Sequence, residues 1–228
     1  RRAVASKDFV FPEEAIAAVD GGQLTAALAL DMLDAHGLRR QAITGGIIPR
    51  TGAQSTVGRA KTLLWMDFAH NDPSTYTLEL AAVDSIRAGE IIVCATGGSQ
   101  RSGIWGELLS TAAQRLGARG IVTDGAVRDI AQMDATGFPV FSRHLSPYDS
   151  FNRQKVVAYD VPVEIDGVRI EPGDLVIADR DGVVIVPAAV EAEIIAAAID
   201  KGRREDGFRA GVRGGMSLTD AYAHFKVL

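Results

Sequence analysis

GIWGELLSTAAQRLGARGIVTDGAVRD, which is Gly103–Asp129, contains the periodicities that decide the fold. In its first half, apolar residues recur at helical spacing and polar residues fill the other positions. The predicted apolar face holds Ile104, Trp105, Leu108, Leu109, Ala112, Ala113 and Leu116, and the polar face holds Glu107, Ser110, Thr111, Gln114 and Arg115. Ser102 or Gly103 is the expected helix cap and Gly117 the expected stop. The run GIVTD then predicts a short strand that leads into the turn GAVRD.

Helices and strands also alternate outside this stretch, which favours an α/β fold. Leu24 to His36 has helical spacing, and GEIIVCATGG at 89–98 is typical of a buried strand. Residues 156–187 form short alternating runs separated by Asp-Gly and Pro-Gly turns, which predicts a β-rich C-terminal part. Pro187 is expected to open a helix that a polar tail follows. We therefore predict one domain over residues 1–228, with a helical extension over about 188–228.

Composition narrows the possible functions. The chain has 228 residues, 47% hydrophobic content and a formal net charge of −5 that is spread along its length. The chain therefore lacks the excess of positive charge that is typical of a protein that binds nucleic acid. The sequence has no apolar run long enough to span a bilayer, and its single cysteine, Cys94, lies in an apolar run typical of a buried strand. We predict a cytoplasmic protein that binds neither nucleic acid nor a membrane.

An acid and an ion pair give the first indication of a site. Glu107 is expected in the first turn of its helix, and 20 residues separate it from Arg128-Asp129, which ends the following strand. The positive end of a helix dipole holds anions, and ligands in α/β sheets bind at the carboxyl edge of the strands. From the residues alone, two simpler explanations stay open. Glu107 is then a solvated acid that complements the dipole, and Arg128-Asp129 is a surface ion pair or a helix cap.

Several blocks of the chain resemble the RraA-like family, which includes the 4-hydroxy-4-methyl-2-oxoglutarate aldolases. The blocks are GELL at 106–109, the pattern acid-X20-Arg-Asp, ARGIVTDGAVRD at 118–129, PGDLVIADRDGVVIVP at 172–187 and VGRAKT at 57–62. They occur in the order of the family and extend from about Leu24 through Glu205. The resemblance implies a swivelling β/β/α domain, with a central sheet layered with helices.

The resemblance also implies an activity and a set of site residues. The aldolases of the family cleave or decarboxylate short 2-oxo acids with a divalent cation. The cation is usually Mg²⁺, and Mn²⁺ can replace it. Asp129 resembles the metal ligand, and Arg128 resembles the residue that stabilises the enolate. The helix start formed by Gly106, Glu107, Leu108 and Leu109 is similar to the turn that binds the pyruvyl carboxylate. Glu107 stands where the aldolases usually carry Asp, and is expected to hold a metal-bound water.

Two further expectations concern partners. Glu205 is similar to a tail acid that reaches the site of a neighbouring subunit, and the family assembles as a homotrimer or a dimer of trimers. Some relatives are non-catalytic regulators that bind an RNA-degrading enzyme, which is the alternative function. We predict catalysis, because the full acid-Arg-Asp set is present.

Overall fold

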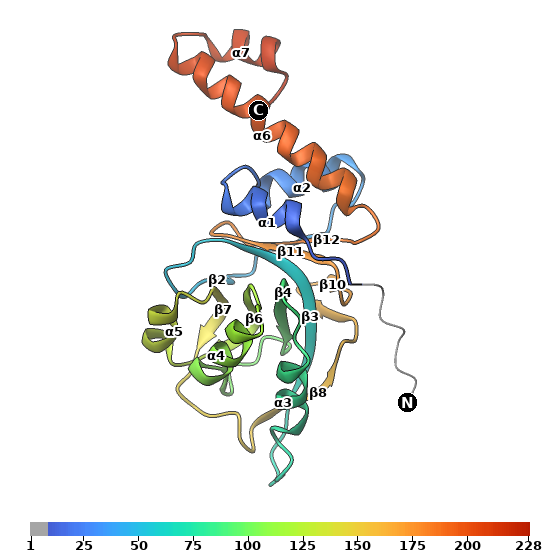
Figure 1. Cartoon of the computed structure of the whole chain (residues 1–228), viewed down its shortest axis with the longest axis vertical. Helices are drawn as coiled ribbons and strands as arrows, with labels where there is room; N and C mark the ends of the chain where they lie inside the picture. Colours follow the sequence, from blue (N-terminus) through green and yellow to red (C-terminus); the bar gives the residue numbers. More distant parts are fainter. Residues whose placement is uncertain (1–8) are drawn as a thin grey trace.

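A curled, mixed β-sheet forms the centre of the structure, a computed structural model that describes residues 9–228 (Figure 1). Neighbouring strands follow the order β1-β12-β11-β3-β4-β6-β7-β2, with β5 paired to β6 and β8 paired to β3. Strands β3, β4, β6 and β7 run parallel, and the flanking strands are antiparallel. The strands of this sheet are β1 (Ala42–Ile43), β2 (Ile48–Pro49), β3 (Thr56–Asp67), β4 (Glu90–Ala95), β5 (Gly103–Trp105), β6 (Gly120–Val127), β7 (Val140–Leu145), β8 (Gln154–Tyr159), β11 (Leu175–Ala178) and β12 (Val183–Val186).

Helices cover the sheet in two groups (Figure 1). The first group packs beside β11 and β12 and consists of α1 (Glu13–Asp20), α2 (Ala26–Ala35) and α6 (Glu191–Arg213). The second group packs against the parallel strands and consists of α3 (Thr77–Asp84), α4 (Glu107–Arg115) and α5 (Ile130–Thr136). Helix α7 (Leu218–Phe225) packs against the end of α6 that extends away from the sheet. Each group buries its own apolar cluster, and both clusters lie on the same face of the sheet, toward different ends of its strand order.

A small hairpin closes the inner face of the curled sheet. It consists of β9 (Val163–Ile165) and β10 (Val168–Ile170), and its apolar residues join the buried cluster of β4, β11 and β12. Asp166 and Gly167 connect the two strands with φ values of 52° and 77°. Two positive φ values are what a two-residue turn of type I′ requires, and Asp-Gly is a preferred pair for it. The β-rich C-terminal part is therefore present as predicted.

The α/β class is confirmed, and so are two of the predicted elements. The helix predicted from Leu24 to His36 is α2, which starts after Thr25, whose hydroxyl accepts a hydrogen bond from the Leu28 backbone at 3.2 Å. Gly37 follows it with a φ of 89°, as a helix stop requires. The predicted buried strand is β4, with Cys94 fully buried within it. The single-domain organisation stays a prediction.

The start of the helix that carries Glu107 was predicted wrongly, and its apolar face was predicted correctly only in part. Ile104 and Trp105 lie in β5, and the helix begins at Glu107, after an extended Gly106. Leu108, predicted to be buried, has 79% of its surface exposed, whereas Ser110 is fully buried. Ala113 is buried as predicted, and Leu109, Ala112 and Leu116 pack against the same cluster, so the predicted face differs only at its N-terminal end.

Two further boundaries differ from the predictions. The helix expected to open at Pro187 begins at Glu191, and it continues through the residues that we had described as a polar tail. Strand β6 extends to Val127, so most of the predicted turn GAVRD belongs to the strand. Among the helices of residues 9–228, none has the length and the apolar character that crossing a membrane requires.

Candidate active site

The β5-α4-β6 unit brings the two ends of the Gly103–Asp129 stretch together. Strand β5 pairs in parallel with the last residues of β6, and the Arg128 backbone N–H donates to the Trp105 carbonyl at 2.9 Å. The Trp105 indole donates to the Ser110 hydroxyl at 2.8 Å, and this hydroxyl donates to the Gly106 carbonyl at 3.0 Å. These buried bonds fix the first turn of α4 beside the end of β6, which explains why Ser110 is buried.

Glycine is needed at both ends of β5. A Cβ atom on Gly103 would lie 2.5 Å from the Ser146 carbonyl oxygen and 3.0 Å from Cβ of Arg128. A Cβ atom on Gly106 would overlap with the Asp129 carboxylate. Gly106 has an extended backbone that any residue can adopt, so its requirement is one of space. The two glycines let the Arg128-Asp129 turn approach β5 and α4 closely.

Asp129 adopts the left-handed conformation, with φ 59° and ψ 36°. This region is rare for residues other than glycine, although aspartate tolerates it better than most. Asp129 stands at the N-cap position of α5, but its side chain makes no capping hydrogen bond there. Its Oδ2 atom instead accepts from the Glu107 backbone N–H at 3.4 Å. The carboxylate therefore points toward the start of α4, which is not what a helix cap would do.

Arg128 lies between two carboxylates. Its Nε is 3.6 Å from Oδ2 of Asp129, and its Nη1 is 3.7 Å from Oδ1 of Asp149. The side chain is 35% exposed. Both contacts are longer than a normal hydrogen bond, so the guanidinium keeps donors for an anionic ligand.

The side chain of Glu107 turns along its own helix. Its Oε1 atom accepts from the Thr111 hydroxyl at 2.8 Å, one turn further along α4. Its backbone N–H, like those of Leu108 and Leu109, belongs to the first turn of α4, where amides lack intrahelical partners. Glu107 thus contributes its amide to the cluster, while Thr111 holds its carboxylate.

Two residues of this cluster were not found from the sequence. Asp149 follows β7 in a loop that is fixed to β5, because the Gly103 backbone N–H donates to the Tyr148 carbonyl at 2.8 Å. The Tyr76 hydroxyl donates to Oδ2 of Asp149 at 2.7 Å. Burial alone would raise the pKa of Asp149, but the Tyr76 hydrogen bond and the Arg128 charge lower it overall. Burial and the same hydrogen bond raise the pKa of Tyr76 to about 12. Neither Tyr76 nor Asp149 belongs to a sequence motif, because only the folding of distant segments brings them to the site.

Other predicted residues lie outside this cluster. Glu205 is on α6, the helix that extends away from the sheet, and lies 3.5 Å from the Lys201 ammonium (Figure 1). Arg50 also lies outside this cluster and donates to the carbonyls of Ser142 and Arg143. Burial and the charges of Arg143 and Arg50 lower the pKa of His144. Within one chain, the structure therefore brings together Gly106, Glu107, Arg128 and Asp129, and leaves Glu205 apart.

The donor set at the turn fits a hard divalent cation that keeps most of its water. Among residues 9–228, no three His, Cys, Asp or Glu side chains gather in the manner of a closed metal site. Mg²⁺ often binds through one or two carboxylates and retains several waters. The Asp129 side chain is 41% exposed. Its carboxylate occupies the space that a side chain on Gly106 would otherwise fill. It can therefore offer an oxygen to such an ion.

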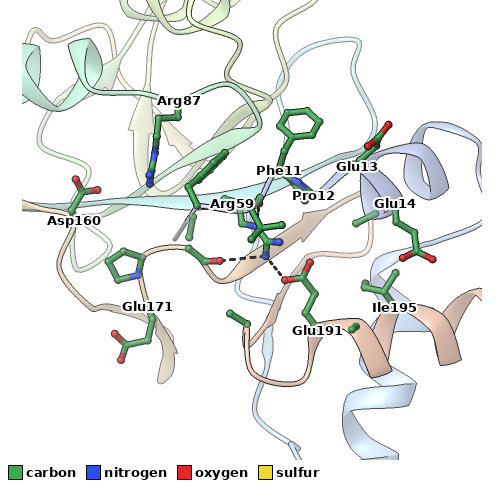
Figure 2. Close-up of a pocket in the computed structure, with 18 residues that line it drawn as sticks. Phe11, Pro12, Glu13, Glu14, Arg59, Arg87, Asp160, Glu171, Glu191 and Ile195 are labelled. Atoms are coloured by element: carbon green, nitrogen blue, oxygen red, sulfur yellow. Dashed lines mark hydrogen bonds and ion pairs between the residues drawn. The ribbon is translucent and has the colours of Figure 1, made fainter. Parts of the chain in front are cut away.

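A cavity of about 570 Å³ lies elsewhere, beneath the segment that precedes α1 (Figure 2). Arg59 lies in its wall, where it forms an ion pair with Glu191 and donates to the Val10 carbonyl at 2.9 Å. The second arginine of the wall, Arg87, pairs with Glu90 at 2.9 Å. Both cations are already neutralised, and the wall carries further acids, which suits an organic acid poorly. We place the candidate active site at Arg128 and Asp129.

Comparison with known proteins identifies the family of the chain. The family model for RraA-like proteins, described as Aldolase/RraA, matches residues 25–185. The chain belongs to the RraA-like family. A Burkholderia mallei protein named "Putative 4-hydroxy-4-methyl-2-oxoglutarate aldolase" is 34% identical over 160 residues, which cover 68% of this chain and 92% of that protein. Protein DlpA of Legionella pneumophila is 28% identical over 84% of this chain, which spans only 31% of the length of DlpA.

Solved structures of RraA-like proteins share the fold. Streptomyces coelicolor RraAS2, described as an unusual member of the RNase ES inhibitor RraA protein family, superimposes with a TM-score of 0.78. It is 29% identical, and the match covers 90% of this chain and 99% of RraAS2. The RraA-like family thus contains proteins named as aldolases and proteins named as inhibitors of RNA processing.

Proposed function

We propose that this RraA-like protein is a divalent-metal-dependent carbon–carbon lyase that acts on short 2-oxo acids. One candidate substrate is 4-hydroxy-4-methyl-2-oxoglutarate, which an aldolase cleaves. The other is oxaloacetate, which a decarboxylase converts. Both reactions release pyruvate. The observation that carries the proposal is the meeting of Arg128, Asp129 and the first turn of α4 at one edge of the sheet. The names of similar proteins as aldolases support it.

The residues of the cluster suit the parts of this reaction. Breaking a bond beside a ketone leaves negative charge on the ketone oxygen, and a fixed cation aimed at that oxygen stabilises the transition state. Arg128 would supply that cation, and the first-turn amides of Leu108 and Leu109 would hold the substrate carboxylate, beside the Glu107 amide that donates to Asp129. Asp129 would hold Mg²⁺ or Mn²⁺, which supplies Lewis-acid chemistry when bound. The Glu107 carboxylate would orient a water molecule once Thr111 releases it.

Pyruvate release tests the proposal directly. The purified protein is assayed with each of the two substrates, with Mg²⁺ and with a chelator. We expect turnover that requires the metal and that falls about 100- to 1000-fold in Arg128→Ala, since one lost oxyanion donor has an effect of this size. Arg115→Ala, on the exposed end of α4, is the matched control and should retain activity. Turnover of neither substrate, or equal turnover in Arg128→Ala, would overturn the proposal.

We further propose that the protein works as a homotrimer or a dimer of trimers, in which Glu205 completes the site of a neighbouring subunit. Support comes from the position of Glu205 on the projecting helix α6, apart from Arg128 of its own chain (Figure 1). Mixing Glu205→Ala with Arg128→Ala tests this, because mixed assemblies regain some intact sites. Recovery of activity on mixing is expected. Full activity of a monomer at high dilution would exclude the arrangement.

A non-catalytic regulator is the second candidate, and the similarity to RraAS2 over nearly its whole length favours it. In this case the protein would inhibit an RNA-degrading enzyme and would release no pyruvate. Inhibition of RNase ES cleavage that is unaffected by Arg128→Ala, together with the absence of turnover, would support the regulator.

A further inference from the structure

A carboxyl group that the proposed reaction does not use is buried behind the Arg128–Asp149 pair. Glu79 lies in the first turn of α3, three residues after Tyr76, whose hydroxyl binds Asp149. Residues three apart share one face of a helix, so Glu79 faces the same loop. Only 4% of its surface is exposed, and its Oε2 has no hydrogen-bond partner among residues 9–228. Buried carboxyl oxygens are seldom left without a partner.

Ionisable residues from four parts of the fold interact electrostatically with Glu79. They are Arg128 at the end of β6, Asp149 in the loop after β7, Tyr76 just before α3 and Cys94 on β4. Burial raises the pKa of Glu79 most, the charge of Asp149 raises it further, and the charge of Arg128 lowers it. The result is a pKa of about 8. At neutral pH the group is therefore an uncharged carboxylic acid.

The charge balance at Arg128 gives this neutral acid a role. Arg128 already faces two carboxylates, those of Asp129 and Asp149. A third negative charge from Glu79 would compete for the same guanidinium and would repel an anionic ligand. We propose that Glu79 is a positioning residue. While Glu79 is protonated, Arg128 is available to an organic acid. When Glu79 ionises, the binding of that acid to Arg128 weakens.

The inference rests on the proposed function, because it assumes that the ligand of Arg128 is a short organic acid. Oxalate is a suitable probe, since it is a planar dianion that resembles the enolate of pyruvate and undergoes no reaction. Its affinity for the full-length protein is measured by calorimetry with Mg²⁺ at pH 6.5 and at pH 9. We expect roughly tenfold weaker binding at pH 9, because ionised Glu79 would add one negative charge that attracts the guanidinium and repels the dianion.

Two variants separate Glu79 from other causes of pH dependence. Glu79→Gln has the shape of the protonated acid and cannot ionise, so its oxalate affinity should be equal at the two pH values. Asp84→Asn removes an exposed acid from the same helix and should behave as the wild type. The proposal is overturned if Glu79→Gln retains the pH dependence, if the wild type shows none, or if oxalate binds at neither pH.

A direct titration covers the case in which Glu79→Gln does not fold. Carbon-13 NMR of labelled glutamate carboxyl groups follows the ionisation of Glu79 in the wild type. Because linkage is reciprocal, saturating oxalate should raise this pKa by about one unit. A pKa that oxalate leaves unchanged would contradict the proposal. Oxalate binding with the expected pH dependence but without any pyruvate release would refute the lyase and leave the role of Glu79 intact.

Discussion

Oδ2 of Asp129 lies 3.4 Å from the backbone nitrogen of Glu107, although the two residues are 22 positions apart in the sequence. The left-handed backbone of Asp129 and the missing side chain of Gly106 make this approach possible. Strained conformations of non-glycine residues often occur at functional sites, where the surrounding structure maintains them. Here Arg128 is hydrogen-bonded to β5 and α5 begins at Ile130, so both neighbours of Asp129 are fixed.

The first prediction concerns the space at Gly106. Gly106→Ala should displace the Asp129 carboxylate, because the new methyl group would occupy the position of Oδ2. We expect pyruvate release to fall roughly 100-fold, since displacements of about 1 Å have effects of this size. Gly52→Ala is the control, because its methyl group would lie at an ordinary 3.4 Å from Oδ1 of Asp134. Unchanged kcat and metal affinity in Gly106→Ala would show that the Asp129 position is unimportant.

A second prediction concerns the bond between Thr111 and Glu107. Thr111→Val keeps the shape of the side chain and removes the hydroxyl that holds the Glu107 carboxylate. If this carboxylate must leave Thr111 to act, Thr111→Val should change kcat by a few fold while KM stays nearly constant. The same substitution in a Glu107→Ala background should have no effect. An equal effect in both backgrounds would mean that Thr111 acts independently of Glu107.

The third prediction is a pH dependence of stability that does not involve activity. Glu79 binds its proton up to a pH of about 8 in the folded protein, whereas its ordinary pKa is 4.5. Between these values the folded state holds the extra proton, so the free energy of unfolding decreases as the pH rises, by up to ~1.4 kcal/mol per pH unit. Above about pH 8 this contribution is lost.

Urea unfolding between pH 6 and 8.5 measures this slope. Glu79→Gln should flatten it, whereas Asp84→Asn should leave it unchanged. The lowered pKa of Asp149 acts in the opposite direction and only at acidic pH, and the raised pKa of Tyr76 acts at alkaline pH, so neither interferes in this range. Identical slopes in wild type and Glu79→Gln would be incompatible with a neutral buried acid.

The fourth prediction concerns the ion pair in the cavity wall. Arg59 and Glu191 are 10% and 17% exposed, and Arg59 also binds the carbonyl of Val10 (Figure 2). Glu191→Ala would leave a mostly buried cation unpaired, which costs roughly 3 kcal/mol of unfolding free energy. Glu171→Ala breaks an exposed pair with Arg169 and should cost less than about 1 kcal/mol. Pyruvate release at 25 °C should be unaffected by either change if the active site is at Arg128.

Local patterns in the sequence predict part of this structure well. The turn signal at Asp166-Gly167 and the periodicity of α2 depend on neighbouring residues, so they can be read without the fold. The proximity of Glu107 to Asp129 was predictable because both lie at the ends of one helix–strand unit. The boundary between β5 and α4 was missed because the apolar Ile104 and Trp105 satisfy the spacing of a helix as well as the pattern of a buried strand.

The contribution of distant residues could not be predicted in this way. Asp149 and Tyr76 are 73 positions apart and meet because α3 packs against β8, while β5 holds the loop that carries Asp149. Glu79 is expected, by helix position alone, to be a solvated first-turn acid, and its burial depends on packing from several strands. Residues that change the charge around a site are thus harder to predict from the sequence than residues that contact the ligand.

The parallel pairing of β5 with β6 has a consequence for how such a protein can diversify. Arg128, Asp129 and the amides of α4 lie within one contiguous segment of the gene, so their arrangement is inherited as a unit. Glu79 and Tyr76 are encoded apart from it, on another helix. Under the role proposed for Glu79, substitutions along α3 would change the pH range of ligand binding at Arg128 and leave the residues of that segment unchanged.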